Sequence, residues 1–119
     1  MTVITWDCFD LAVQKILHFI KTEKKQYKSI YGIPRGGIPL AIRLSHELDL
    51  PLLMGGVDSN TLVVDDIADS GFALTPFIER SKCDTITICR KNWCPVKPTY
   101  WVYDTESWVH FPWEKQNAS

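Results

Sequence analysis

The sequence predicts an α/β fold in which a mostly parallel central sheet is flanked by helices. Segments with apolar residues at helical spacing alternate with short apolar or β-branched runs that are typical of buried strands. Gly, Pro, Asn and Asp punctuate the connections between these segments. The chain has 119 residues, a length that suits one compact domain spanning 1–119.

The first helix is expected over residues 7–24, because its apolar residues repeat on one face at helical spacing. The other expected elements are strand 29–33, helix 38–48, strand 50–54, strand 61–64, helix 72–80, strand 85–89 and strand 99–103. Helices between successive strands favour parallel pairing. The tail 106–114 is aromatic without a period, and we expect it to fold back as a small hood over the edge or mouth of the sheet.

Composition excludes several classes of function. Hydrophobic residues make up 45% and charged residues 23% of the chain, which is typical of globular proteins. The net charge of −1 does not favour nucleic-acid binding, and no apolar run is long enough to span a membrane. The first residues lack the pattern of a signal peptide, so we expect a cytoplasmic protein with reduced cysteines. Cys89 and Cys94 lack partners at zinc-ligand spacing, which disfavours a metal-thiolate site.

The most informative segment is the apolar run 62–64, which leads directly into Asp65 and Asp66 and then into Asp69, Ser70 and Gly71. In open α/β sheets, ligands bind beyond the carboxyl ends of the strands. Two carboxylates there suit vicinal hydroxyls or a magnesium ion, and the turn that follows could hold a phosphate on its amides at the start of the next helix. The alternative is a solvated turn, since turns favour these residue types.

A second candidate site follows the strand 29–33. Arg35, Gly36 and Gly37 combine a guanidinium that can bind phosphate oxygens with glycines that let the backbone approach an anion closely. The alternative is an ordinary strand-to-helix turn with a surface arginine. The two sites together would suit one ligand that carries a ribose, a monophosphate and a pyrophosphate.

These residues resemble a known family, the type I phosphoribosyltransferases, and among them the bacterial xanthine-guanine enzymes. Residues 64–71, Val-Asp-Asp-Ile-Ala-Asp-Ser-Gly, resemble the family's signature for phosphoribosyl pyrophosphate (PRPP). Residues 33–37, Ile-Pro-Arg-Gly-Gly, resemble its pyrophosphate loop, which often contains a non-proline cis peptide. The opening 5–7 and the closing 107–114 resemble the same subgroup, so the resemblance covers nearly the whole chain.

The resemblance implies a reaction in which a purine nitrogen displaces pyrophosphate from PRPP with the help of Mg²⁺, as in purine salvage. It implies that Asp65 and Asp66 hold the ribose and the metal, directly or through water, and that Asp69 acts as general base or stabilises charge beside the purine. Binding of the 5′-phosphate would fall to Asp69, Ser70, Gly71 and Ala73, and binding of pyrophosphate to Arg35, Gly36 and Gly37. It also implies a dimer or tetramer.

The purine would be read by the later segments. The resemblance implies that Lys91 donates to the exocyclic oxygen of guanine, xanthine or hypoxanthine, that Trp108 stacks on the ring, and that the backbone of Val109 reads its edge. Alternatives stay open for two of these residues. Trp108 could be an aromatic that covers the core, and Lys91 could be a plain surface charge.

The chain departs from the family in two places. Family members carry a long flexible lid before the PRPP signature, whereas here only residues 56–60 separate Gly55 from Thr61. Ala73 replaces the usual hydroxyl residue of the phosphate turn. Besides a 6-oxopurine phosphoribosyltransferase, two hypotheses therefore remain: a PRPP- or nucleotide-binding module with little or no turnover, and an interaction protein that keeps only the fold.

Overall fold

The structure, a computed structural model, describes residues 1–115. Its centre is a parallel sheet of five strands in the order β3-β2-β4-β5-β6. The strands are β2 (Ser29–Gly32), β3 (Leu52–Leu53), β4 (Thr61–Ala68), β5 (Asp84–Lys91) and β6 (Tyr100–Thr105). This arrangement confirms the predicted mostly parallel sheet.

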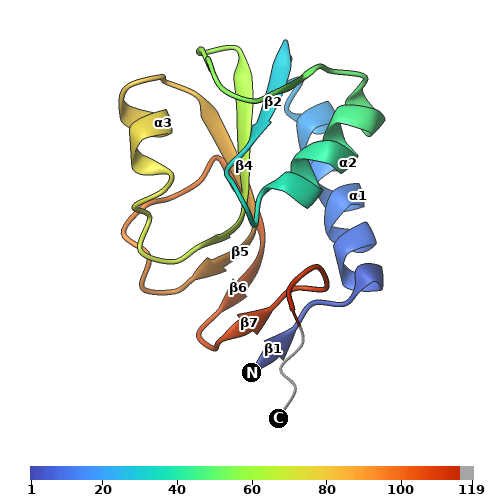
Figure 1. The fold of residues 1–119 in the computed structure, drawn as a ribbon, viewed down its shortest axis with the longest axis vertical. Coiled ribbons are helices and arrows are strands. Elements are labelled where there is room, and N and C mark those ends of the chain that lie inside the picture. Colours follow the sequence, from blue (N-terminus) through green and yellow to red (C-terminus); the bar gives the residue numbers. More distant parts are fainter. Residues whose placement is uncertain (116–119) are drawn as a thin grey trace.

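The helices α1 (Trp6–Thr22) and α2 (Ile38–Leu48) lie together on one side of the sheet, and α3 (Thr75–Glu79) lies on the other (Figure 1). The Thr5 hydroxyl caps α1 by accepting from the backbone N–H of Cys8 at 3.1 Å. The buried apolar face of α1 packs with α2 and the inner strands into the main core. The helices of the described chain are too short or too polar to cross a bilayer.

A second, two-stranded sheet pairs β1 (Thr2–Val3) with β7 (Val109–His110), and neither strand was predicted. Figure 1 shows this pair beyond one end of the main sheet. Phe111 and Trp113 follow β7 and stack with ring centroids 5.2 Å apart, and Trp113 also meets Phe9 of α1 at 5.4 Å. The tail therefore forms the expected aromatic hood.

Several elements differ in length from the prediction: β3 is shorter than the expected strand 50–54, and β5 extends beyond 85–89 at both ends. Two further differences bear on the site. β4 continues through Asp65 and Asp66 to Ala68, because its backbone keeps pairing with β5 regardless of the acidic side chains. The helix expected over 72–80 is confined to Thr75–Glu79. Gly71 has φ +82°, outside the helical region, and Pro76 occupies the first turn, where a missing N–H costs nothing.

The link before β4 is a compact turn. The backbone N–H groups of Thr61 and Asn60 donate to the carbonyl and the carboxylate of Asp58, at 3.0 and 2.8 Å. The Asp58 N–H donates in turn to the Thr61 hydroxyl at 3.1 Å. These bonds hold residues 58–61 in a tight turn, and the short link 54–60 provides no lid over the end of the sheet.

Candidate active site

Asp65 and Asp66 lie inside β4, near the end of the strand. Asp65 is only 9% exposed, and its Oδ1 accepts from the backbone N–H of Asp66 at 2.8 Å. Burial, and then the charge of Asp66, raise the pKa of Asp65 to about 8. Burial also raises the pKa of Asp66, and the negative charge of Glu114 in the hood adds to this effect. Anything that supplies positive charge or hydroxyl donors here would favour the ionised forms.

The carboxylate pair fits a magnesium ion of the kind that shares its coordination with a substrate. Mg²⁺ is commonly held by one or two carboxylates together with substrate phosphates, rather than by a cage made only of protein atoms. Within residues 1–115 no group of three or more His, Cys, Asp or Glu side chains could hold a metal by itself. As two adjacent carboxylates in β4, Asp65 and Asp66 could supply the protein's part of such a shared site.

The glycine-arginine loop touches this acidic end of β4. A Cβ at Gly36 would overlap the Asp66 carboxylate, so only glycine allows the loop to come this close. The peptide bond between Pro34 and Arg35 is cis, and the Arg35 side chain is exposed without an ion-pair partner among the described residues. The two predicted sites are therefore adjacent in space, although about thirty positions separate them in the sequence.

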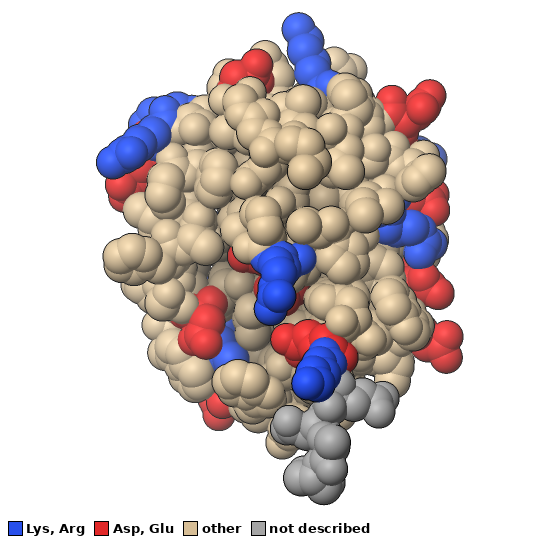
Figure 2. All heavy atoms as spheres, in the orientation of Figure 1, with Lys and Arg blue, Asp and Glu red and all other residues tan. Residues whose placement is uncertain are grey.

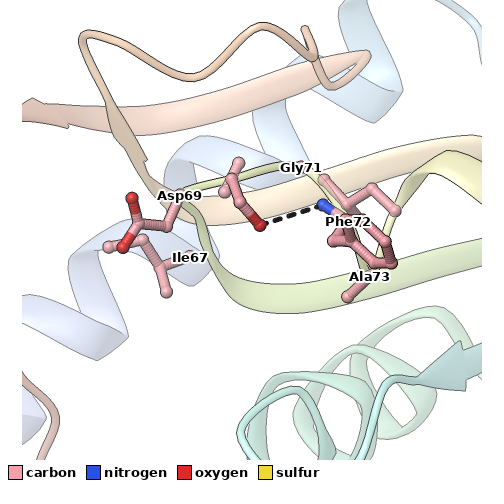
Figure 3. Close-up of a pocket in the computed structure, with 8 residues that line it drawn as sticks. Ile67, Asp69, Gly71, Phe72 and Ala73 are labelled. Carbon is pink, nitrogen blue, oxygen red and sulfur yellow. Dashed lines mark hydrogen bonds between the residues drawn. The ribbon is translucent and has the colours of Figure 1, made fainter.

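Residues 67–74 line a cavity of about 100 Å³ at the end of β4 (Figure 3). The Ser70 hydroxyl accepts from the backbone N–H of Phe72 at 3.2 Å, while the amides of Gly71 and Ala73 have no partner in the described chain. Because α3 begins at Thr75, these amides lie in the turn that leads into the helix. An anion could still bind to free amides of the turn itself.

The Asp69 carboxylate points away from the Phe72–Ala73 end of this turn (Figure 3). Its Oδ1 accepts from the indole N–H of Trp93 at 2.9 Å. Sequence reasoning missed Trp93, because no motif contains it and its partner lies 24 positions away. Its position two residues after Lys91 was the one available signal.

Lys91 is the last residue of β5 and is only 6% exposed, so it is not a plain surface charge. Its ammonium donates to the Ser107 carbonyl and lies 5.1 Å from the centre of the Trp93 ring. Two further N–H donors of the ammonium are left for a ligand. Lys91 therefore joins the end of the main sheet to the segment that precedes β7.

The Trp108 side chain is 73% exposed, and the alternative that it covers the core is wrong. The Val109 side chain is buried, while its backbone lies in β7. The backbone N–H groups of Thr2 and Ile4 donate to the carbonyls of Trp108 and His110, at 2.8 and 2.9 Å. Because carbonyls alternate in direction along a strand, the Val109 carbonyl faces the other side, away from β1.

One face of the molecule mixes both charges. Figure 2 shows acidic and basic side chains around a hollow near the middle of the molecule, with largely neutral surface above it. Phe72, in the turn that follows Gly71, is 87% exposed. The turn therefore exposes an aromatic side chain beside the cavity lined by residues 67–74.

No protein-family model and no curated protein matches the chain. Among solved structures, a purine phosphoribosyltransferase from Pyrococcus horikoshii is 29% identical and superposes with a TM-score of 0.85, covering 99% of this chain and 97% of its own. A xanthine-guanine-hypoxanthine phosphoribosyltransferase from Helicobacter pylori is 18% identical, with a TM-score of 0.80 over 92% and 90% of the two chains. A Neisseria gonorrhoeae protein solved with bound ppGpp is 18% identical, with a TM-score of 0.74 over 96% and 90%.

These likenesses agree with the parallel sheet flanked by helices. The Pyrococcus protein covers the chain almost end to end, so the short link 54–60 occurs within a chain of very similar length to a solved relative. On this evidence the chain has the type I phosphoribosyltransferase fold, and over nearly its whole length it is similar to a purine phosphoribosyltransferase.

Proposed function

We propose that the chain transfers the 5-phosphoribosyl group of PRPP to guanine, xanthine or hypoxanthine and releases pyrophosphate. The contact between Gly36 and the Asp66 carboxylate carries this proposal, because it brings an anion-binding loop to a hydroxyl-binding acidic pair. One molecule with a ribose between two phosphate groups can span both. The likeness to a solved purine phosphoribosyltransferase supports the same reaction.

Asp65 and Asp66 would accept hydrogen bonds from the ribose hydroxyls and hold magnesium, directly or through water. When bound, magnesium neutralises charge on the pyrophosphate and makes it a better leaving group. The amides of Gly71 and Ala73, together with Ser70 and Asp69, would hold the 5′-phosphate at the turn. Arg35, Gly36 and Gly37 would hold the pyrophosphate at the facing loop.

Base selection would depend on Lys91, Asp69 and the segment around β7. A lysine ammonium donates and cannot accept, so it suits the 6-oxygen of guanine and disfavours the amino group of adenine. Asp69 would accept a proton from the ring or stabilise charge that develops on it. Trp108 would stack on the purine, and the Val109 carbonyl would read its edge. Solved orotate and adenine phosphoribosyltransferases share the fold, so these side chains and not the fold must choose the base.

We also propose that the protein acts in cytoplasmic purine salvage, as a single-domain subunit of a dimer or tetramer. The test of the reaction is incubation with PRPP, Mg²⁺ and each purine base in turn, while pyrophosphate and nucleotide are measured. The Asp65→Asn, Asp66→Asn double variant is the negative control, and its fold is checked by circular dichroism. Folded wild-type protein that yields no nucleotide with any base contradicts the proposal.

The second candidate function is a PRPP- or nucleotide-binding module without turnover. The compact turn 54–60 favours it, because family members use a lid at this place to exclude water. Ala73 also removes one hydroxyl donor from the phosphate turn. Calorimetry separates the two functions: the module binds PRPP in a way that depends on Asp65 and Asp66, but yields no product.

A further inference from the structure

Trp93 makes two contacts that join separate parts of the site. Its indole N–H donates to Asp69 Oδ1 at 2.9 Å, and the Lys91 ammonium lies 5.1 Å from the centre of its ring. Asp69 follows β4, whereas Lys91 ends β5. A single side chain therefore contacts the two charged groups that we assign to the purine, and no motif of the sequence includes it.

The loop that carries Trp93 is held in place from both ends. The Arg90 guanidinium donates to the carbonyls of Cys94 and Val96, at 2.8 and 3.1 Å. The Asn92 side-chain amide donates to Glu106 at 2.7 Å. Residues 92–96 thus have several fixed points, so the Trp93 ring starts from a defined backbone.

The same loop packs against the phosphate turn. Val96 occupies the space where a Cβ at Gly71 would lie. The turn that would hold the 5′-phosphate and the loop that holds Asp69 are therefore in direct contact. Since residues 54–60 supply no cover, the Trp93 ring of this fixed loop is an aromatic wall in contact with both charged groups.

We propose that Trp93 is a positioning residue, which holds the Asp69 carboxylate and the Lys91 ammonium in register for a 6-oxopurine. This role rests on the proposed phosphoribosyl transfer. The indole N–H occupies one carboxylate oxygen and so leaves the other oxygen with a defined direction. The ring attracts the ammonium through its negative face, which restrains a side chain that otherwise has many rotamers.

Two substitutions separate these contacts. Trp93→Phe keeps an aromatic ring beside Lys91 but removes the donor to Asp69, so kcat should fall about tenfold while KM for the base changes little. Trp93→Ala removes both contacts, so KM for guanine and the Kd of GMP should also rise about tenfold. The affinity for PRPP, measured by calorimetry with Mg²⁺, should stay within about twofold of wild type in both variants.

Trp101 offers a matched control. Its indole N–H also donates to a carboxylate, Asp104 at 2.8 Å, and its ring also carries a cation, with the Arg90 guanidinium 5.0 Å from the ring centre. It lies on β6, outside the proposed site. Trp101→Phe loses a hydrogen bond of the same type. Because this bond lies outside the proposed site, the variant should retain kcat, KM and both affinities.

The bond between Trp93 and Asp69 can be observed without turnover. In a ¹⁵N-labelled protein the Trp93 indole resonance is the one that disappears in Trp93→Phe. It should shift in Asp69→Asn and stay in place in Asp104→Asn, which should move the Trp101 resonance instead. If the chemical shift of the Trp93 indole is the same in Asp69→Asn as in wild type, the proposed contact is wrong.

The remaining outcomes distinguish the two proposals. If wild type transfers the phosphoribosyl group and both Trp93 variants behave like Trp101→Phe, the positioning role is wrong. If PRPP affinity falls together with GMP affinity, Trp93 only supports the fold, and the role is again wrong. If wild type neither transfers nor binds a purine nucleotide, the proposed function fails and this role fails with it.

Discussion

Asp65→Asn should stabilise the ligand-free protein at neutral pH. The pKa of Asp65 is raised from its ordinary value of 3.8 to about 8, chiefly by burial. Between these values the unfolded chain carries the charge and the folded chain carries the proton. Folding therefore takes up a proton, and the free energy of unfolding falls as pH rises from about 4 to about 8. Below this window both states are protonated and the full stability is present.

The size of the effect follows from the linkage between pKa and stability. One pKa unit corresponds to about 1.4 kcal/mol, and pH 7 lies about three units above the ordinary value. Keeping Asp65 protonated in the folded protein at pH 7 therefore lowers the free energy of unfolding by about 4 kcal/mol relative to its value at low pH, where both states are protonated. Asparagine cannot ionise, and its side-chain oxygen can still accept from the Asp66 N–H.

The assay is urea unfolding in the presence of a chelator at pH 5, 6, 7 and 8. The stability difference between Asp65→Asn and wild type should grow steadily across this series. Glu79→Gln is the control, because Glu79 is exposed on the short helix α3, and its effect should stay constant. A difference between Asp65→Asn and wild type that does not change with pH would refute the reasoning, since the burial of a titrating carboxylate would then not be its cause.

Three further experiments test other parts of the structure. Gly71→Ala should cost more stability than Gly56→Ala: both glycines have positive φ, worth about 1 kcal/mol each, but only at Gly71 does a Cβ also meet a neighbouring side chain. Equal losses in thermal unfolding would exclude that clash. Tyr27→Phe should cost about 2 kcal/mol in urea unfolding, because the Tyr27 hydroxyl donates to the Asp84 carboxylate at 2.7 Å; an unchanged midpoint would show that the bond contributes nothing. Lys91→Ala should weaken the binding of GMP more than that of PRPP in calorimetry, and equal losses for both ligands would make Lys91 structural. Chelation of Mg²⁺ should abolish transfer, as measured by initial rates.

The sequence predicts the larger elements well, because their signals are local. Helix 38–48 carries its own apolar period and is found with these bounds, and the apolar run 62–64 identifies the centre of β4. The extension of β4 to Ala68 was not predictable from aspartates, which disfavour strands. Pairing with β5 decides it, and that pairing depends on the rest of the sheet.

The candidate site likewise contains some residues with a local sequence signal and others whose role depends on distant parts of the chain. Each of its two motifs is continuous in the sequence, so both can be recognised before their separation in space is known. Trp93 has no such local signal, since its contact with Asp69 exists only after β5 and β4 pair. The strands β1 and β7 have two residues each, too few for any period, and they form only because distant segments meet.

The pairing of β1 with β7 determines when the site can be completed. Thr2 and Ser107, 105 positions apart, share a hydrogen bond beside this pair, so the hood closes only after nearly all of the chain is available. A nascent chain that stops after β5 already contains both loops that we propose bind the sugar and its phosphates. It also contains Asp69 and Lys91, but it lacks Trp93, Trp108 and Val109, which would complete the recognition of the base. During synthesis, the ability to select a nucleobase should therefore arise last, in one late step that joins the two ends of the polypeptide.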